Sequence, residues 1–162
     1  MIIEEKIMKK IINEMRVRLL AISKNESVAR AVVSAFVASA NPTLSELSEL
    51  RLATSEAVTN SVVHGYRNVE NKKNSFIYIS LRLYDTREVT IEISDNGSGI
   101  ADVALARTPA FTTGADEGRC GMGFLLMESS TDALSVRSRV GRGTTVFMRK
   151  YLKPLQKEED EE

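Results

Sequence analysis

Apolar residues recur along this chain at two spacings, which predict alternating blocks of strand and helix. The stretches SFIYISLRLYD (75–85) and EVTIEISD (88–95) are apolar at every second position and flank a short polar turn, which predicts an antiparallel hairpin. ALSVRSR and TTVFMRK flank VGRG and predict a second hairpin near the C-terminus. MRVRLLAIS alternates well enough to predict a further strand near 16–22.

A helix is predicted directly after that first strand. Ser23 precedes Glu26 by three residues, which is the spacing of a capping box, in which each side chain bonds the other residue's backbone N–H. The helix is expected to run to about Ser39, because Asn41 and Pro42 follow.

A second helix follows at once. Thr43 and Glu46 form another capping-box pair, and Gly65 ends a helix that is expected to reach about His64. By helical spacing, its buried face consists of Leu47, Leu50, Ala53, Ala57, Val58 and Ser61.

The rest of the chain completes a single domain without repeats or linkers. Residues 3–15 have an apolar residue at every fourth position and are interpreted as a short amphipathic extension, while a glycine-bearing stretch (96–121) precedes a third helix (121–131). We therefore expect an N-terminal extension (1–15), one α+β domain with helices on a mixed sheet (16–152), and a solvated acidic tail (153–162).

Composition narrows the class of protein. The 162 residues are 43% hydrophobic and 27% charged, which is typical of a globular domain, and 22 basic residues balance 22 acidic ones. This balance does not indicate a nucleic-acid or membrane surface. The single cysteine, Cys120, excludes an intramolecular disulfide, and no apolar run is long enough to span a bilayer. We expect a soluble cytoplasmic protein.

The second helix has polar residues at a strict spacing of four. Glu56, Asn60 and His64 share one helical face and border the apolar stripe. Such a face is most often a solvated helix edge, but a carboxylate and a carboxamide one turn apart can also line a cleft. His64 by itself favours a packing or capping role at the end of the helix.

Two glycine-bearing stretches carry the other candidate chemistry. Asp95-Asn96-Gly97-Ser98-Gly99 follows a predicted strand, and Gly121-Met122-Gly123 opens the third helix. The first is by itself typical of a strand-ending turn, and the second of an ordinary helix start. Neither is a Walker A loop or a Rossmann fingerprint.

Taken together, these three stretches favour a nucleotide pocket. Asp95 can accept a hydrogen bond from the amino group of adenine, and Gly97 and Gly99 leave room for base and ribose. Asn60 offers Mg²⁺ an amide oxygen, and the backbone N–H groups of 121–123 at a helix N-terminus suit phosphates. Glu56 then lies where a general base is needed.

In their order along the chain, ExxxN, DxGxG, GxG and a late GTT resemble the Bergerat ATP-binding fold of gyrase, Hsp90, histidine kinases and MutL. Within it, the chain is similar to the anti-sigma factor serine kinases, and most closely to the anti-sigma-F factors. The resemblance runs from about residue 13 to 150 and includes NEM, SKNESVAR, AFVA, SEAVTN, HGY, FTT, GMGF and GTTV.

The resemblance implies a two-layer α/β sandwich that binds ATP and Mg²⁺ and forms a homodimer. It also implies sequestration of a sporulation sigma factor of the sigma-F type, and phosphorylation of a serine on an anti-anti-sigma factor. The implied site residues are Glu56 as catalytic base, Asn60 for Mg²⁺, Asp95, Gly97, Gly99 and Thr145 for adenine, Thr112 and Thr113 in the ATP lid, Arg119, Gly121, Met122 and Gly123 at the phosphates, and Arg30 at the partner surface. The chain departs from the family pattern at Gly114, usually lysine, and Cys120, usually serine.

Three other functions stay open from the sequence. They are a general-stress anti-sigma kinase, an ATP-dependent binding module without phosphotransfer, and a detached histidine-kinase catalytic domain. Glu56 argues against the last, because a serine hydroxyl benefits from a general base whereas an imidazole needs little deprotonation.

Overall fold

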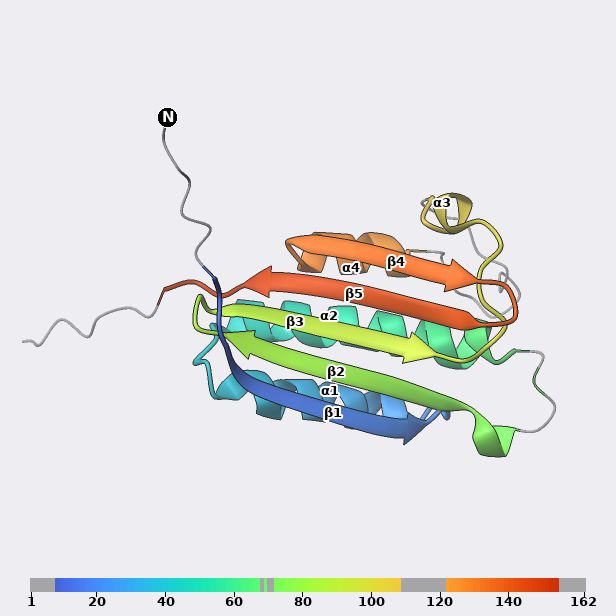
Figure 1. Cartoon of the computed structure of the whole chain (residues 1–162), viewed down its shortest axis with the longest axis horizontal. Coiled ribbons are helices and arrows are strands. Elements are labelled where there is room, and N and C mark those ends of the chain that lie inside the picture. The colour runs from blue at the N-terminus through green and yellow to red at the C-terminus, as the bar shows by residue number, and fades with distance from the viewer. Residues whose placement is uncertain (1–7, 68, 70–71, 109–121, 155–162) are drawn as a thin grey trace, which may run out of the picture.

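The computed structural model describes residues 8–67, 69, 72–108 and 122–154, and they form two layers (Figure 1). One layer is a five-stranded sheet, and the other consists of helices that cover one of its faces. The strands are β1 (Ile11–Leu20), β2 (Phe76–Tyr84), β3 (Glu88–Asp95), β4 (Ala133–Arg139) and β5 (Gly143–Tyr151). The helices are α1 (Asn25–Ala38), α2 (Leu44–Asn60), the π-helical turn η1 (Ser61–Gly65), the 3₁₀ turn η2 (Lys72–Asn74), α3 (Val103–Ala106) and α4 (Gly123–Ser130).

The strand order is β1-β2-β3-β5-β4, and all four pairings are antiparallel. The α+β two-layer class is confirmed, but the expected mixed sheet is wrong. Helices α1 and α2 lie between β1 and β2 in the chain. They return the chain to the end of the sheet where β1 stops, so β2 runs antiparallel beside β1. The connection through α3 and α4 does bring β4 parallel to β3, but β5 lies between them (Figure 1).

Strand β1 begins earlier than its sequence predicts. Residues 11–15 were expected in an amphipathic extension, yet Met15 pairs with Leu81, and Ile11 with Tyr84. An apolar residue at every fourth position also falls on one face of a strand, because four is a multiple of two. β1 is an edge strand with mostly exposed side chains, so the burial contrast that would mark it as a strand is weak.

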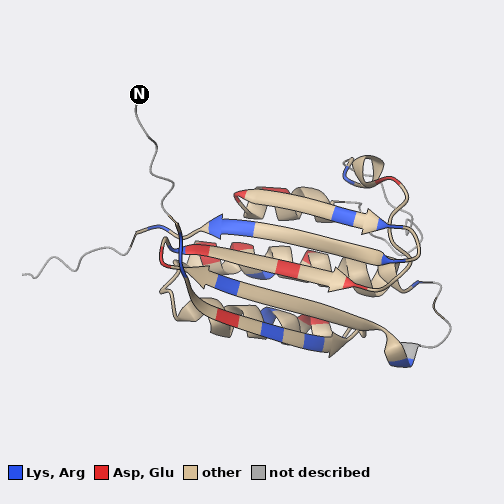
Figure 2. Ribbon diagram, in the orientation of Figure 1, with Lys and Arg blue, Asp and Glu red and all other residues tan. Residues whose placement is uncertain are grey.

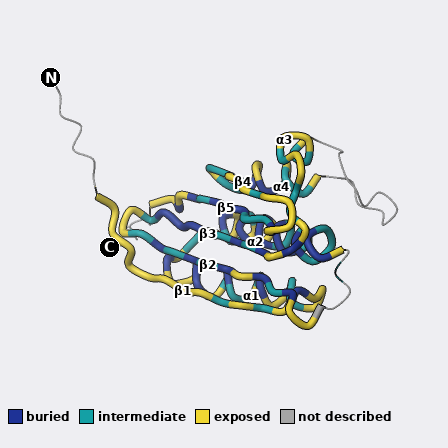
Figure 3. The backbone as a smooth tube through the Cα atoms, turned by 45° about the vertical axis from the view of Figure 1, so that its right-hand side comes forward, coloured by how far each residue is buried: buried dark blue, intermediate teal, exposed yellow. Residues whose placement is uncertain are grey.

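The core lies between the sheet and the helices, as the buried inner layer in Figure 3 shows. From α2 it includes Leu50, Ala53, Ala57 and Val58, which confirms most of the predicted buried face; Ser61 is also buried, whereas Leu47 is half-buried. Within the described residues, no helix combines the length and apolarity that a bilayer-spanning segment needs.

The capping box predicted at the start of α2 is confirmed. The Thr43 hydroxyl accepts from the Glu46 backbone N–H (3.2 Å), and the Glu46 carboxylate accepts from the Thr43 N–H (2.7 Å). The other Glu46 oxygen accepts from the Lys153 N–H at 2.7 Å. Burial alone would raise the pKa of Glu46, but these hydrogen bonds from Lys153 and Thr43 hold it below its ordinary value. Glu46 therefore joins the start of α2 to the segment after β5.

The capping box predicted at Ser23 is wrong. Helix α1 begins at Asn25 after Lys24, with no side-chain cap. The Glu26 carboxylate instead accepts hydrogen bonds from Arg30 and from Ser55 on α2. The Arg30 guanidinium on the same helix and the Ser55 hydroxyl on α2 thus bind this carboxylate in place of a backbone N–H.

Helix α2 continues past its α-helical end at Asn60 as one π-helical turn. The Tyr66 N–H donates to the Ser61 carbonyl at 3.2 Å, five residues back instead of four. The helix therefore reaches Gly65, in agreement with the predicted extent, but its last turn is wider than periodicity predicts. Single π-turns of this kind often occur at functional sites.

Glu46→Ala tests the junction between α2 and the end of β5. We expect the free energy of unfolding at neutral pH to fall by about 2 kcal/mol, because a lost cap and an unpaired backbone N–H each cost on the order of 1 kcal/mol. Since the folded-state pKa of Glu46 is lowered, its carboxylate stabilises the fold above the ordinary glutamate pKa, and this contribution is lost as the pH falls through the folded value.

Urea unfolding followed by circular dichroism, at neutral pH and at a pH below the glutamate range, measures both effects. The difference between the two proteins should shrink at the acid pH. Ser48→Ala, an exposed change on the same helix, should stay within about 0.5 kcal/mol of the wild type. An equal loss for Glu46→Ala at both pH values would contradict the role of the ionised carboxylate.

Candidate functional site

Asp95 is the last residue of β3 and is only 5% exposed. Its Oδ1 accepts from the Gly97 N–H (2.9 Å) and the Thr144 N–H (3.3 Å), and its Oδ2 accepts from the Ser61 hydroxyl (2.9 Å). Each carboxylate oxygen has two lone pairs. Within the described part of the chain, Oδ2 therefore keeps the capacity to accept one further donor.

Burial raises the pKa of Asp95, and the hydrogen bonds from Gly97, Ser61 and Thr144 oppose this rise. Buried carboxylates of this kind gain from additional donors, because each one replaces solvation that the ionised form has lost. The arrangement suits a ligand with an N–H donor, as the sequence predicts for the amino group of adenine.

The turn after β3 packs directly on the π-turn η1. A side chain at Gly97 would place its Cβ 2.1 Å from the Gly65 carbonyl oxygen, and the Ser98 N–H donates to that oxygen at 2.7 Å. A Cβ at Gly99 would lie 2.2 Å from the Arg139 carbonyl oxygen. Both glycines thus have a packing role against neighbouring backbone, and their contact with base and ribose stays a prediction.

Glu56 and Asn60 meet the first residue of α4. A Cβ at Gly123 would lie 3.1 Å from Oε2 of Glu56 and 3.4 Å from Oδ1 of Asn60. The structure therefore brings together the ExxxN face of α2 and the glycine that opens α4, which are more than sixty residues apart in the sequence. Met122, at the N-cap, makes no side-chain capping bond, so its side chain leaves the first N–H groups of α4 available to an anion.

The far end of α4 is held against α2 by Lys150. Its Nζ lies 2.6 Å from Oε2 of Glu49 and donates to the Ser130 carbonyl at 3.1 Å. Lys150 is 9% exposed, and a buried ammonium needs such partners. Since Ser130 is the last residue of α4, this contact fixes how α4 lies along α2.

Thr144 faces the site from β5, and Thr145 does not. The Thr144 N–H bonds Asp95, and its hydroxyl lies 2.9 Å from that of Ser138. Side chains alternate along a strand, so Thr145 shares a face with its partner Ser94, opposite the face of Asp95. The predicted placement of Thr145 at the adenine site is therefore wrong. The GTT motif contains two threonines, and the register of β5 puts the first of them, Thr144, on the face of Asp95.

Ser61 and Tyr66 belong to the site although neither was among the predicted site residues. Ser61 bonds Asp95, and the Tyr66 hydroxyl accepts from the Asn96 N–H at 2.9 Å. Burial of Ser61 follows from helical spacing, but its hydroxyl partner does not. Thr112, Thr113, Arg119 and Gly121 lie outside the described residues, as do Gly114 and Cys120.

Arg30 lies apart from these groups, where α1 packs on α2. Its Nη1 bonds the Glu26 carboxylate and lies 3.0 Å from the Ser55 hydroxyl, and its side chain is 34% exposed. Ser55 directly precedes Glu56. The predicted partner contact is thus partly accessible, and it adjoins the candidate site through Ser55.

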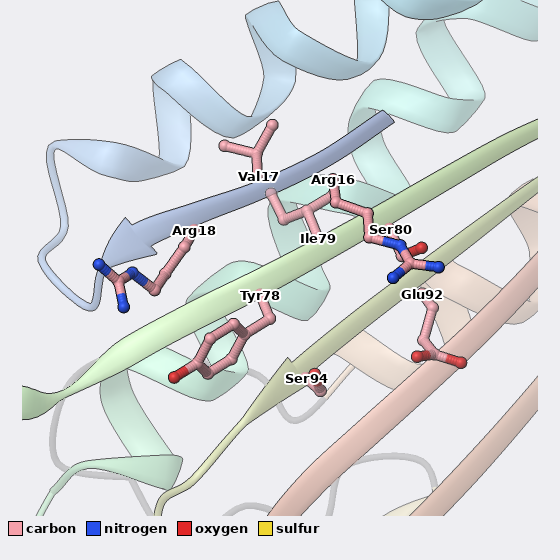
Figure 4. A pocket seen from close by; sticks show the side chains of 8 residues that line it. All are labelled: Arg16, Val17, Arg18, Tyr78, Ile79, Ser80, Glu92 and Ser94. Atoms are coloured by element: carbon pink, nitrogen blue, oxygen red, sulfur yellow. The ribbon is translucent and has the colours of Figure 1, made fainter. Parts of the chain in front are cut away.

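The open face of the sheet has a shallow groove of about 200 Å³, lined among others by Arg16, Arg18, Tyr78 and Glu92 (Figure 4). Basic residues are frequent on the strands (Figure 2). Asp95 points to the opposite face of the sheet, toward the helices, as do the buried residues of β3. The groove is therefore separate from the candidate site.

Known proteins share this sequence over most of its length. A family model described as a histidine kinase-like ATPase domain matches residues 22–150. An anti-sigma F factor of Geobacillus sp. (strain WCH70) is 46% identical over 140 residues, which cover 86% of this chain and 93% of that protein. The chain belongs to the anti-sigma F factor family, within the histidine kinase-like ATPases.

One further relative agrees with this assignment, and one solved structure shares the fold. The anti-sigma F factor of Bacillus licheniformis is 45% identical over 140 residues, 86% of this chain and 93% of that family member. Among solved structures, the RsbU and RsbW domains of a Mycobacterium tuberculosis protein match with a TM-score of 0.62 and 20% identity, over 88% of this chain and 33% of that one. At this identity the likeness shows a shared fold. The family model confirms the expected architecture of a histidine kinase-like ATPase domain.

Gly123→Ala tests the contact between α4 and α2. The added methyl group crowds the Glu56 carboxylate and the Asn60 amide, and we expect ATP affinity to fall about fivefold, the equivalent of about 1 kcal/mol, because the amide assigned to Mg²⁺ must move. Stability should be maintained or rise slightly, because alanine favours a helix over glycine.

Gly141→Ala is the matched control. Its Cβ meets nothing within 4 Å, but its φ of +73° is strained for alanine. It should lower stability by about 1 kcal/mol while leaving ATP affinity unchanged. Calorimetry measures ATP affinity, and thermal unfolding measures stability. Unchanged ATP affinity in Gly123→Ala would show that the contact between α4 and α2 does not affect nucleotide binding.

Proposed function

We propose that this protein is an ATP-dependent protein-serine kinase that acts as an anti-sigma factor in the cytoplasm of a spore-forming bacterium. It would form a homodimer, bind a sigma factor of the sigma-F type, and phosphorylate a serine of an anti-anti-sigma antagonist. The names of its relatives support the sigma-factor partner. The observation that carries the kinase activity is the contact of Gly123 with both Glu56 and Asn60.

The described residues fit ATP with Mg²⁺. Asp95 offers an acceptor at one end of the site, and Gly123 opens a helix without a side-chain cap at the other. In the part of the chain that the structure describes, no cluster of three His, Cys, Asp or Glu residues could hold a metal by itself. Mg²⁺ suits such a site, because it is commonly held by one or two protein oxygens together with phosphates and water. The Asn60 amide oxygen would supply the protein ligand.

ATP supplies the phosphoryl group when it is bound, and the chain supplies position and a base. Glu56 would accept the proton of the acceptor serine as its hydroxyl oxygen attacks, since this hydroxyl is a weak nucleophile at neutral pH. The Glu56 carboxylate adjoins the N-terminus of α4, where backbone N–H groups favour negative charge. The general base Glu56 and the anion-binding N–H groups of α4 are therefore neighbours, as in-line phosphoryl transfer requires.

Glu56→Gln tests the kinase directly. Glutamine keeps the shape of the side chain but cannot act as a base, so phosphotransfer should fall on the order of a hundredfold to ten-thousandfold. ATP affinity should change little, because Glu56 is assigned to the acceptor serine. The wild type and the variant would be incubated with Mg²⁺-ATP and an anti-anti-sigma protein, and the acceptor followed by intact-mass spectrometry.

Glu92→Gln, on the open face of the sheet, is the matched control and should retain full transfer. A wild type that transfers no phosphate but holds a sigma factor in an ATP-dependent complex would favour the binding module. Transfer that depends on a different sigma factor and antagonist would favour a general-stress anti-sigma kinase.

Arg30→Ala tests the partner surface. Arg30 is bonded to Glu26 and Ser55 and is not among the groups that bond Asp95. Its loss should therefore weaken binding to sigma factor and to anti-anti-sigma at least about tenfold, the scale of a lost interfacial arginine. ATP affinity should stay within twofold of the wild type. Surface plasmon resonance measures partner binding, and calorimetry measures ATP affinity. Arg16→Ala, on the open face of the sheet, is the control. If Arg30→Ala instead loses ATP binding, Arg30 has a structural role.

A further inference from the structure

The π-turn η1 places two hydroxyl groups at the end of β3. Ser61, its first residue, donates to Oδ2 of Asp95 at 2.9 Å. Tyr66, which follows its last residue, accepts from the Asn96 N–H at 2.9 Å. The Ser61 hydroxyl thus bonds the side chain of Asp95, and the Tyr66 hydroxyl bonds the backbone of the next residue, Asn96.

The Tyr66 hydroxyl uses its full bonding capacity. It donates to the Phe76 carbonyl at 2.5 Å and also accepts from the Phe76 N–H at 3.2 Å. Burial raises the pKa of Tyr66, so the phenol keeps the proton that it donates. Tyr66 is 2% exposed and is packed in the core. A single oxygen therefore joins the start of β2 to the turn after β3.

The Ser61 hydroxyl and two backbone N–H groups restrict the Asp95 carboxylate, while Tyr66 holds the backbone of the next residue. Oδ1 is held by two backbone N–H groups and Oδ2 by Ser61, so the plane of the carboxylate cannot rotate without breaking a hydrogen bond. The acceptor capacity that remains on Oδ2 is thus fixed in direction. Adenine presents an amino donor to such an acceptor, whereas guanine presents a carbonyl oxygen at the equivalent position of its ring, which a carboxylate repels.

We propose that the hydroxyls of Ser61 and Tyr66 are positioning groups that hold Asp95 and Asn96 for adenine and thereby set the preference for ATP over GTP. This inference rests on the proposed function, since it requires that Asp95 reads the base. Ser61 acts through the Asp95 carboxylate, and Tyr66 acts through the Asn96 backbone. The preference is therefore determined partly by the last turn of α2, and not by β3 alone.

Tyr66→Phe and Ser61→Ala each remove one oxygen and keep the rest of the side chain. Calorimetric titration of the protein alone with ATP and with GTP should show ATP affinity reduced about threefold to tenfold in each variant, the equivalent of one lost hydrogen bond. GTP affinity should change less, so the ratio of the two affinities falls. Tyr78→Phe, on the open face of the sheet, and Ser39→Ala, at the end of α1, are the matched controls and should keep the wild-type ratio.

A second measurement needs no nucleotide. Amide hydrogen exchange followed by NMR should show reduced protection of the Asn96 N–H in Tyr66→Phe and wild-type protection in Tyr78→Phe. If Tyr66→Phe does not fold, Ser61→Ala carries the test, because alanine is readily accepted in a helix.

The possible failures are distinguishable. A wild type without preference for ATP over GTP would overturn the assignment of Asp95 to adenine in the proposed function. A wild-type preference that both variants keep within twofold would overturn the positioning role while leaving the proposed function intact. An equal loss of ATP and GTP affinity, together with a lower melting temperature, would assign the hydroxyls a purely structural role and also overturn the inference.

Discussion

A carboxylate buried at the end of β3 must be hydrogen-bonded, and this requirement organises one whole end of the molecule. An unpaired buried charge costs several kcal/mol or more. Asp95 meets the requirement with donors from three separate segments, namely Ser61, Gly97 and Thr144. The end of α2, the turn after β3 and the start of β5 are therefore held in one place by one side chain. The glycines at this junction allow the backbones to approach closely enough to donate.

Helix α2 relates this junction to the other half of the site. Asn60 adjoins Gly123 of α4, and the next residue, Ser61, bonds Asp95. Glu56 lies one turn earlier on the same helix. The separation between Asp95 and the N-terminus of α4 is thus set within one rigid element, and Lys150 keeps α4 aligned with it by bonding Glu49 and Ser130. Rigid elements hold such groups more accurately than loops do.

The sequence predicted most of the elements, and its errors have physical causes. The same capping motif was right at Thr43 and wrong at Ser23, because Glu26 has stronger partners on α1 and α2 that a local pattern does not contain. Residues 11–15 were missed as strand because a spacing of four fits both helix and strand. The paired ExxxN and GxG motifs predicted which chain segments meet, and the structure brings Glu56, Asn60 and Gly123 together. Thr144 could not be told from Thr145 without the register of β5. Helical spacing predicted the burial of Ser61 but not its bond to Asp95, and the position of Tyr66 could not be predicted because a π-turn does not follow the helical period.

The π-turn also limits which changes of length this chain tolerates. In an α-helix, a residue inserted or deleted rotates everything beyond it by about 100°. Between Asn60 and Tyr66, such a change would leave a continuous helix yet turn either Ser61 or Tyr66 away from the end of β3. Substitutions can vary the chemistry of this segment, but its residue count is fixed by two contacts at its two ends. Homologous chains that conserve both contacts should therefore differ here in composition and never in length.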